Sequence, residues 1–537
     1  MRVEEVGKWD EAHDVIVVGF GAAGGIAAIE AHDAGADVVL LEKMAFPGGL
    51  SAISAGGIRV SDDADGAFEY LKWTCGGRTP DDLLHDLAKA MVELPEYIRG
   101  LAEVNGATVR VTPAVGNYPF PGYTSLGYCE VSEVPDLEDG RKYYATSATT
   151  NGTRLIKVLE DNIARREIPV RYQTAAKELV ADAYGQICGL IVERDGKTIS
   201  IRSRRAVILT CGGFENNAEM QRQYLQMGEV RPTSFLGNTG DGIAMAQAVG
   251  ADLWHMWHVH GPYGLHDPSN EYPFAFFHKA IPMWTPGHTG SISNLGIEGS
   301  AKTEKPRKTI AKLAWILVDR DGRRFMNEYP PYPGDTGLRP FDLFDPLKQD
   351  FARRPAYMIF DENGRKMYPM GYAAWNDDQA SYTWSKDNLE EINRGIFRRA
   401  DSLEELADGI GALVEQIRET VEDWNACVGE GEDALYGRRA ETMVRIDNPP
   451  FYYGEVGPVV INTQGGPRHS RLQQVLSPFG TPIDRLYAAG ELGSVFGHLY
   501  MAGGNLAECI AGGRTAGREA AGLEPLARAL ENTSQLV

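Results

Sequence analysis

Residues 14–24 read DVIVVGFGAAG, and this stretch determines the fold class of the chain. The run of β-branched residues at 14–18 predicts a buried strand, and the alanine-rich residues 22–34, closed by Gly35, predict a helix. The apolar residues 37–41 predict a second buried strand. A strand, a glycine turn, a helix and a parallel strand form a βαβ unit with a right-handed crossover. The chain therefore opens an α/β domain.

The turn between this strand and this helix carries the pattern G-x-G-x-x-G at Gly19, Gly21 and Gly24, and Glu42 ends the second strand. In such a unit the first glycine makes the turn, the second admits a pyrophosphate, and the third lets the helix pack on the strand. The helix N-terminus attracts the anion, and Glu42 accepts a hydrogen bond from a ribose hydroxyl. The alternative is that the glycines serve only a tight turn, but the context favours a dinucleotide site.

Composition narrows the class of protein. A chain of 537 residues, at about 150 residues per domain, holds two to four folding units. Its formal net charge of −21 argues against nucleic acid and anionic lipid as partners. The six cysteines form no C-x-x-C pair, which fits a reducing compartment. With no apolar run of 18 residues and no signal-peptide pattern, we expect a cytoplasmic protein without a membrane span.

A second glycine-rich loop follows Glu42, at 47–51 (PGGLS) and 54–57 (SAGG). With these blocks the sequence resembles FAD-binding flavoproteins of the fumarate reductase and succinate dehydrogenase superfamily. The family's later blocks are matched in order at 210–214 (TCGGF), 240–242 (GDG), 462–466 (NTQGG), 486–491 (LYAAGE) and 503–506 (GGNL). The resemblance implies a Rossmann-type FAD-binding domain, with an inserted α+β capping domain that takes the substrate.

We place the domain limits from this resemblance and from the composition. Further strands of the first sheet are expected at 170–180, 187–193, 197–201 and 206–210, and aromatic side chains then crowd between 254 and 284. The FAD-binding domain is expected at 13–255 and 450–525, the capping domain at 256–449, and a tail at 526–537.

The same resemblance implies that FAD is the cofactor. Glu491 would bind the ribityl chain, and the helix that starts near Asn505 would aim its positive end at the flavin N1 and O2 region. Members with covalent FAD have a histidine where this chain has Leu50, so non-covalent FAD is expected. The residues expected to bind FAD are Gly19, Gly21, Ala22, Ala23, Gly24, Glu42, Lys43, Gly48, Gly49, Ser51, Gly56, Gly57, Ala176, Gly212, Asp241, Glu491, Asn505 and Leu506.

The substrate site departs from the fumarate reductases. Those enzymes follow a segment similar to residues 321–328 with a proton-donating arginine, near whose place this chain has Tyr332. They also carry a carboxylate-binding arginine where this chain has Tyr500. Tyrosines at both places resemble the 3-ketosteroid dehydrogenases, especially those that oxidise the 4,5-bond. A neutral ketone needs hydrogen-bond donors and a base near its α-carbon, which phenols can supply.

The expected reaction is α,β-dehydrogenation of a cyclic ketone, either a 3-ketosteroid or a cyclohexanone-type compound. Tyr500 would take the α-proton with support from Tyr332, the backbone N–H groups of Gly503 and Gly504 would hold the enolate oxygen, and the β-hydride would pass to flavin N5. The pKa of a free phenol is about 10, so a helix N-terminus, the oxidised flavin or a second phenol must lower it. The alternatives are that Tyr500 only packs beneath the flavin and that Tyr332 only lies in a rigid loop.

Two other functions stay open. One is an enoate or enone reductase that holds a carboxylate through Arg339, Arg468 or Arg514. The other is an electron carrier, which an aromatic-rich cap disfavours because such a cap excludes water and encloses substrate. The electron acceptor and the oligomeric state are not predicted.

The sequence also contains a group of three histidines and an aromatic loop. His255, His258 and His260 alternate with other residues as in a strand or loop, so no metal is expected. The aromatic loop at 117–123 could form a lid over the substrate, with Tyr118, Tyr123 or Tyr128 in contact with it, or a surface Ω-loop.

Overall fold

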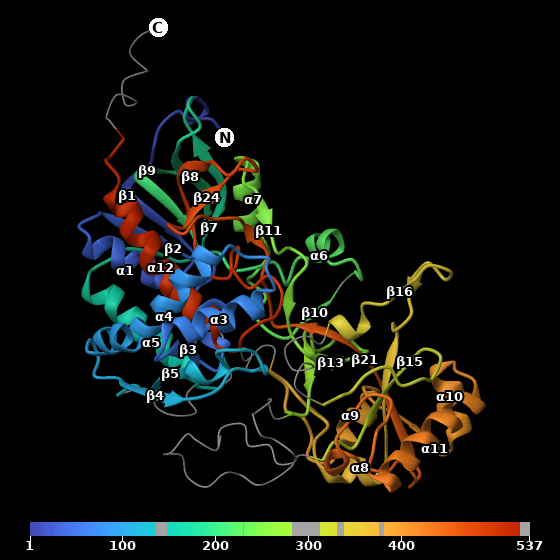
Figure 1. Ribbon diagram of the computed structural model, residues 1–537. Coiled ribbons are helices and arrows are strands. Elements are labelled where there is room, and N and C mark those ends of the chain that lie inside the picture. Colours follow the sequence, from blue (N-terminus) through green and yellow to red (C-terminus); the bar gives the residue numbers. More distant parts are fainter. Residues whose placement is uncertain are drawn as a thin grey trace.

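The computed structural model describes residues 1–135, 137, 146, 148–228, 230–281, 312–329, 338–374 and 381–526. Two lobes, each built around an eight-stranded sheet, are visible in Figure 1. One lobe carries the first part of the chain and the last helix, and the other carries most of the middle of the chain.

The first sheet confirms the expected α/β fold. Its order is β24-β25-β9-β1-β2-β6, and β7 and β8 form a hairpin that continues from β9. Strand β1 pairs in parallel with both β2 and β9, so that Ile16 lies between Val39 and Val207. The two strands expected at 197–201 and 206–210 are one strand, because β9 pairs with β8 along its first half and with β1 over most of its length. The strands of this sheet are β1 (Glu11–Val18), β2 (Val38–Leu41), β6 (Val170–Arg171), β7 (Thr174–Ala181), β8 (Ile187–Arg194), β9 (Lys197–Leu209), β24 (Gln474–Leu476) and β25 (Pro482–Ala488).

Helices α1 (Ala22–Asp33) and α12 (Gly504–Gly522) lie against each other on this lobe (Figure 1). Glycines of α12 allow the close approach: a Cβ atom on Gly513 would lie 2.6 Å from the carbonyl oxygen of Ala23, and one on Gly517 would lie 2.5 Å from that of Ala27. This packing places the middle of α12, around Gly513, against the first turn of α1. The lobe also contains α2 (Gly49–Ile53), α3 (Ala64–Cys75), α4 (Asp81–Ala102), α5 (Asn151–Arg165) and a small sheet of β3 (Ile58–Ser61), β4 (Thr108–Pro113) and β5 (Leu126–Glu133).

The second sheet has the order β15-β18-β21-β13-β14-β19, with β10 and β20 also paired to β21. Strand β21 starts after residue 449 and strand β10 lies before residue 256, so the sheet extends past both expected limits of the capping domain. Strand β21 joins this sheet because it pairs with β10, β13, β18 and β20. The strands are β10 (Arg231–Pro232), β13 (Tyr263–His266), β14 (Ala275–His278), β15 (Ile316–Asp319), β18 (Ala356–Asp361), β19 (Gly371–Tyr372), β20 (Arg398–Ala400) and β21 (Phe451–Val460).

Helices and short ladders complete the two lobes. The second lobe carries α8 (Glu362–Met367), α9 (Leu389–Asn393), α10 (Leu403–Ile410), α11 (Val414–Glu430) and the hairpin β16 (Phe344–Asp345) with β17 (Asp350–Phe351). Two ladders join the chain after residue 252 to the region before α12, namely β11 (Leu253–Trp254) with β23 (Gly466–Pro467) and β12 (Val259–His260) with β22 (Asn462–Thr463). The remaining helices are α6 (Ala218–Tyr224), α7 (Asp241–Ala248) and 3₁₀ turns at Val3–Glu5, Tyr123–Ser125, Arg339–Phe341 and Ala440–Thr442. Within the described ranges, no helix is both long and apolar enough to cross a bilayer.

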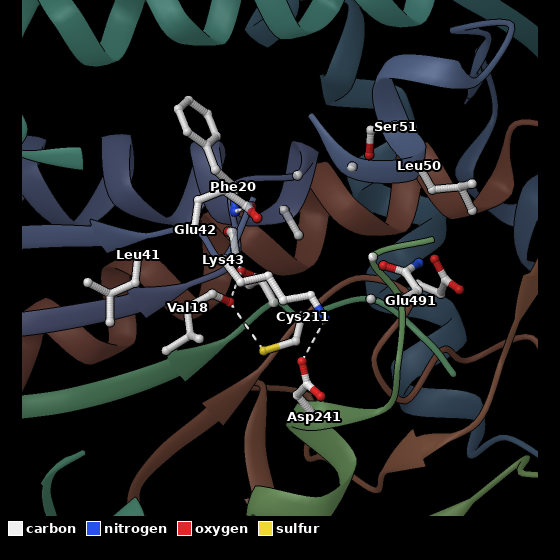
Figure 2. Close-up of a pocket in the computed structure, with 18 of the residues that line it drawn as sticks. Val18, Phe20, Leu41, Glu42, Lys43, Leu50, Ser51, Cys211, Asp241 and Glu491 are labelled. Atoms are coloured by element: carbon white, nitrogen blue, oxygen red, sulfur yellow. Dashed lines mark hydrogen bonds and ion pairs between the residues drawn. The ribbon is translucent and has the colours of Figure 1, made fainter. Parts of the chain in front are cut away.

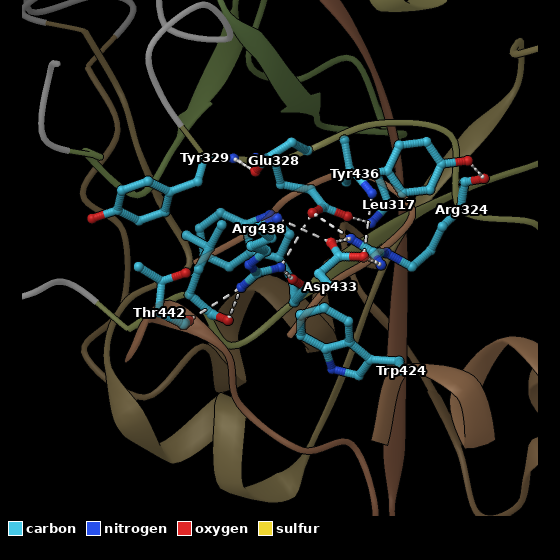
Figure 3. A network of polar contacts seen from close by, with 12 residues as sticks. Leu317, Arg324, Glu328, Tyr329, Trp424, Asp433, Tyr436, Arg438 and Thr442 are labelled. Carbon is cyan, nitrogen blue, oxygen red and sulfur yellow. Dashed lines mark hydrogen bonds and ion pairs between the residues drawn. The ribbon is translucent and has the colours of Figure 1, made fainter. Parts of the chain in front are cut away.

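A buried network of charged side chains lies in the core of the second lobe (Figure 3). The Glu328 carboxylate lies 3.3 Å from guanidinium nitrogens of both Arg324 and Arg438, and it also accepts a hydrogen bond from the backbone of Leu317 at 2.9 Å. Asp433 forms an ion pair with Arg324 at 3.0 Å, so two carboxylates balance the two guanidinium groups. The segment similar to the fumarate reductases therefore ends in a carboxylate that ties it to the core of the lobe.

Candidate functional site

A cavity opens at the carboxyl ends of β1, β2 and β9 (Figure 2). Ligands of open α/β sheets bind at this end of the strands. Its lining combines the glycine turn before α1, the end of β2, the loop before α2, the loop before α7 and the start of the segment after β25. The lining residues that the sequence analysis expected to bind FAD are Gly19, Gly21, Ala22, Ala23, Glu42, Lys43, Gly49, Ser51, Ala176, Gly212, Asp241 and Glu491.

The three glycines of the pattern face different surroundings. A Cβ atom on Gly19, whose φ is +104°, would lie 2.5 Å from the carbonyl oxygen of Thr210, and one on Gly24 would lie 1.8 Å from that of Gly19. A Cβ atom on Gly21 would meet nothing closer than Ser51 Oγ at 3.7 Å. Gly19 and Gly24 are therefore required by the packing of the chain itself, whereas Gly21 leaves open the space of the cavity.

Glu42 shapes the turn from the second strand. Its carboxylate accepts hydrogen bonds from the backbone N–H groups of Phe20 and Met44, both at 2.8 Å, and burial raises its pKa. Next to it, Lys43 forms an ion pair with Asp241 at 2.7 Å, which Figure 2 shows beside the cavity. The pair joins the end of β2 to the start of α7. Charged groups from two elements, the end of β2 and the start of α7, thus lie in front of the glycine turn.

Glu491 contributes a carboxylate to the opposite side of the cavity (Figure 2). Its Oε1 atom is buried and has no hydrogen-bond partner among the described residues. A Cβ atom on Gly213 would lie 2.5 Å from this oxygen and 2.7 Å from Oε2 of Glu215, so the two acids crowd the same glycine. Burial and the neighbouring Glu215 raise the pKa of Glu491. The site therefore presents an acceptor that a ligand hydroxyl would satisfy.

The turn before α12 holds the side chain of Tyr500. The N–H of Gly503 donates to the phenolic oxygen of Tyr500 at 3.1 Å, and the N–H of Gly504 donates to the carbonyl of Met501 at 2.6 Å. The Tyr500 side chain is buried, and its ring lies against His260 of β12 with a centroid distance of 3.7 Å. The two amides expected to hold an enolate are thus engaged within the turn, and one of them binds the expected base.

Arg59 and two tyrosines of the expected lid form hydrogen bonds that stabilise this turn. Arg59 is fully buried, and it donates from Nε to the carbonyl of Ala502 at 2.9 Å and from Nη2 to the phenol of Tyr128 at 2.5 Å. Tyr118 is also buried and donates from its hydroxyl to the carbonyl of Tyr500 at 3.0 Å. These contacts anchor the backbone on both sides of the turn. The sequence alone did not indicate Arg59, because an arginine two residues after a glycine pair belongs to no recognised pattern.

The other expected site residues lie outside the lining of the cavity. Gly24 and Leu506 pack within α1 and α12, and Asn505 exchanges hydrogen bonds with Gln464. Gly48, Gly56 and Gly57 lie in the loops around α2; a Cβ atom on Gly503 would lie 2.7 Å from the carbonyl oxygen of Gly57. Tyr332 falls outside the described residues. Lining residues that were not expected include Thr210, Cys211, Phe235, Asn238 and Cys509. Of these, only Thr210 and Cys211 belong to a recognised block.

Two of the candidate histidines bind backbone carbonyls, whereas two of the candidate arginines form ion pairs with carboxylates. His255 and His258 donate to the backbone carbonyls of Ser494 and Phe496, at 2.7 and 2.5 Å. Arg468 pairs with Asp252, and Arg514 pairs with Glu93. Within the described part of the chain, no group of three His, Cys, Asp or Glu side chains is arranged to hold a metal ion.

The chain belongs to a family of FAD-dependent proteins: the model of the FAD binding domain matches residues 14–272 and 296–506. This match confirms the predicted fold class and FAD as the cofactor. It defines the protein as an FAD-dependent oxidoreductase.

Two relatives and one crystal structure are similar to this chain over most of its length. The chain is 27% identical to digoxin reductase of Eggerthella lenta, covering 96% of this chain and 88% of the relative. It is 26% identical to 3-oxosteroid 1-dehydrogenase of Mycobacterium tuberculosis, covering 91% and 94%. Its fold matches the crystal structure of 3-ketosteroid Δ1-dehydrogenase from Sterolibacterium denitrificans with a TM-score of 0.74, at 24% identity over 95% of this chain and all of that one. The predicted resemblance to the 3-ketosteroid dehydrogenases is thereby confirmed.

Proposed function

We propose that the protein desaturates the α,β-bond of a cyclic ketone, either a 3-ketosteroid or a smaller cyclohexanone-type compound. The observation that carries this proposal is the hydrogen bond from Gly503 N–H to the phenolic oxygen of Tyr500. It places a donor at the atom that would take up the proton. A relative of similar length whose name is 3-oxosteroid 1-dehydrogenase supports the same reaction class.

The residues around the cavity fit FAD. The space in front of Gly21 would take the pyrophosphate, the buried carboxylate at Glu42 would meet the ribose, and the unpartnered Oε1 of Glu491 would accept from the ribityl chain. Leu50 lines the cavity and has no nucleophilic atom, so no covalent bond to the cofactor would form at this position. When bound, FAD supplies the acceptor for the hydride that leaves the β-carbon.

Tyr500 would take the proton from the α-carbon onto its phenolic oxygen. A hydrogen bond donated to this oxygen favours the ionised phenol, and so does the positive end of α12, which begins at Gly504. The ring of His260 packs against Tyr500 and limits its rotation, while Tyr118 holds its backbone. Because the side chain is only 8% exposed, little water competes for the proton.

Anaerobic titration of the purified yellow protein with saturated cyclic ketones tests this proposal. We expect bleaching of the flavin near 450 nm with at least one 3-ketosteroid or substituted cyclohexanone, and the corresponding alcohols should cause none. The matched alcohols control for binding without an acidic α-carbon. If no saturated ketone in such a panel bleaches the flavin, the proposed direction is wrong.

Two observations support a second candidate, reduction of an enone or enoate. One relative is named digoxin reductase. Of the three arginines considered as carboxylate ligands, Arg339 alone has no ion pair with a carboxylate among the described residues. The same protein, reduced chemically without oxygen, should then regain its colour on addition of an enoate. Recovery of colour with enoates, together with no response to ketones, would favour the reductase.

A further inference from the structure

Two arginines from different lobes meet around one histidine. Arg78 lies between α3 and α4 of the first lobe, and Arg339 begins the 3₁₀ turn Arg339–Phe341, whose Phe341 packs in the core of the second lobe. Arg78 donates to Nδ1 of His498 at 3.1 Å, and Arg339 donates to the same atom at 3.3 Å and to the carbonyl of His498. Both guanidinium groups also face the ring of Trp257, at 5.2 and 5.1 Å from its centroid.

Among the residues that the structure describes, this cluster carries positive charge without a counter-ion. Neither Arg78 nor Arg339 forms an ion pair with a carboxylate in the described part of the chain. Asp342 interacts with Arg339 only electrostatically, without forming an ion pair. Burial and the two guanidinium groups lower the pKa of His498 to about 4, so the histidine is neutral at pH 7 and accepts their hydrogen bonds. Burial and Arg78 also lower the pKa of Arg339.

Such an arrangement is unexpected in a chain with a formal net charge of −21. Two like charges that share one neutral acceptor repel each other, and an anion placed between them would remove this repulsion. The guanidinium fork matches the two oxygens of a carboxylate. The cluster lies next to the proposed reaction site, because His498 precedes Tyr500 by two residues. The 37% exposed ring of Trp257 offers an apolar surface beside the two charges.

We propose that Arg78 and Arg339 bind a carboxylate that the cyclic substrate carries away from its reacting carbonyl, with Trp257 in contact with the adjoining apolar part. This inference rests on the proposed function for the nature of the reacting group. The substrate class is then a cyclic keto acid rather than a neutral ketone. Because the arginines come from different lobes, a bound carboxylate also joins the two lobes over the Tyr500 site.

Binding is tested first with an unreactive pair of probes on the FAD-loaded protein. Cyclohexanecarboxylate and cyclohexanecarboxamide have nearly the same shape and differ in charge, and their dissociation constants follow from the change in flavin absorbance. We expect the acid to bind on the order of tenfold or more tightly than the amide. Arg78→Gln and Arg339→Gln should each weaken binding of the acid by a similar factor and leave the amide unaffected.

Arg471→Gln is the matched control, because Arg471 is an exposed arginine that pairs with Asp86 on the surface. It should bind both probes as the parent does. Equal binding of acid and amide by the parent, or unchanged discrimination in Arg339→Gln, overturns the proposal. Inorganic phosphate that displaces cyclohexanecarboxylate at a concentration well below that of acetate would also overturn it, since the site would then be a phosphate site.

A reactive pair separates this proposal from the proposed function. 4-Oxocyclohexanecarboxylate should bleach the flavin at a lower half-saturating concentration than its methyl ester, and this difference should vanish in Arg78→Gln/Arg339→Gln. If the acid binds through both arginines but no ketone bleaches the flavin, the desaturase function fails and the carboxylate site stands. If acid and ester bleach the flavin at equal concentrations, the function stands and the carboxylate site fails.

Discussion

The backbone N–H of Gly503 and the phenolic oxygen of Tyr500 are joined by a hydrogen bond of 3.1 Å. Gly503 has a φ of +78°, and a Cβ atom there would lie 2.7 Å from the carbonyl oxygen of Gly57 and 3.1 Å from the backbone nitrogen of Arg59. The donor is therefore held rigidly by a glycine that the packing requires. This rigidity matters because a fixed donor stabilises a charge on the phenol without reorganising.

Tyr500→Phe should separate chemistry from packing. The ring that lies against His260 remains and only the hydroxyl is lost, so FAD content should persist while flavin reduction by a ketone falls by about 10² to 10⁴. The rate is measured by anaerobic stopped flow. Tyr184→Phe, at a tyrosine that is 92% exposed, is the control and should react like the parent. A Tyr500→Phe protein that is as fast as the parent would show that this phenol is not the base.

Gly21→Val and Gly24→Val should fail at different stages. At Gly21 the nearest atom to a new Cβ is 3.7 Å away, so the variant should fold and purify with little flavin, because the side chain fills the cavity. At Gly24 the new Cβ would lie 1.8 Å from a backbone oxygen, so the variant should yield little folded protein. Flavin per chain and circular dichroism report the two outcomes. Gly7→Val, where no atom lies within 4 Å, is the control. Full flavin content in Gly21→Val would contradict the placement of the pyrophosphate.

Acid precipitation should release all of the flavin from the protein into the supernatant. Leu50 lines the cavity and cannot form a histidyl bond to the flavin. The absorbance of supernatant and pellet near 450 nm measures the two fractions. Colour that stays with the precipitated chain would disprove non-covalent binding.

Because of Glu508 in α12, the free energy of unfolding should fall as the pH rises toward 7. This buried carboxylate accepts hydrogen bonds from Val495 N–H and Ser494 Oγ, both at 2.7 Å, and burial raises its pKa to about 7. The folded state thus holds a proton that the unfolded chain releases near pH 4.5. Between pH 4.5 and 7 the free energy of unfolding should therefore decline by roughly 3 kcal/mol from this group, and it should change no further above pH 7.

Urea denaturation across this pH range measures the effect. Glu508→Gln should lack this part of the slope, whereas Glu415→Gln, at an exposed position of α11, should keep the slope of the parent. An unchanged slope in Glu508→Gln would exclude Glu508 as its source.

Glu328→Gln should destabilise the second lobe by about 3 to 5 kcal/mol, because it leaves the buried charges of Arg324 and Arg438 without one of their two acids. Both guanidinium groups lie over the ring of Trp424, at 4.6 and 4.7 Å from its centroid, so its fluorescence reports the loss during urea denaturation. Breaking the exposed Arg471–Asp86 pair by Asp86→Asn should change the unfolding free energy very little. Similar effects of the two substitutions would contradict a structural role of the buried network.

The sequence by itself determined the local features of the first lobe. The strand at 14–18, the helix after it and the turn between them depend on residues that are neighbours in the chain, and the structure confirms them as β1 and α1. Gly19 and Gly24 could be assigned in the same way, because the close approach that excludes a side chain lies within one strand-turn-helix unit. The matched blocks up to residues 503–506 indicated the family for the same reason, because each block is a short stretch of the chain.

Only the tertiary structure decided which distant residues meet. Strand β21 belongs to the second sheet because its partners come from four other parts of the chain, and no local pattern specifies those partners. Tyr500 could be located from the sequence, but its contact with His260 depends on the path of the chain between the lobes. Arg78 and Arg339 illustrate the same limit: each is an ordinary arginine in the sequence, and their shared contact with His498 arises only when the two lobes come together, since charge acts through space rather than along the chain.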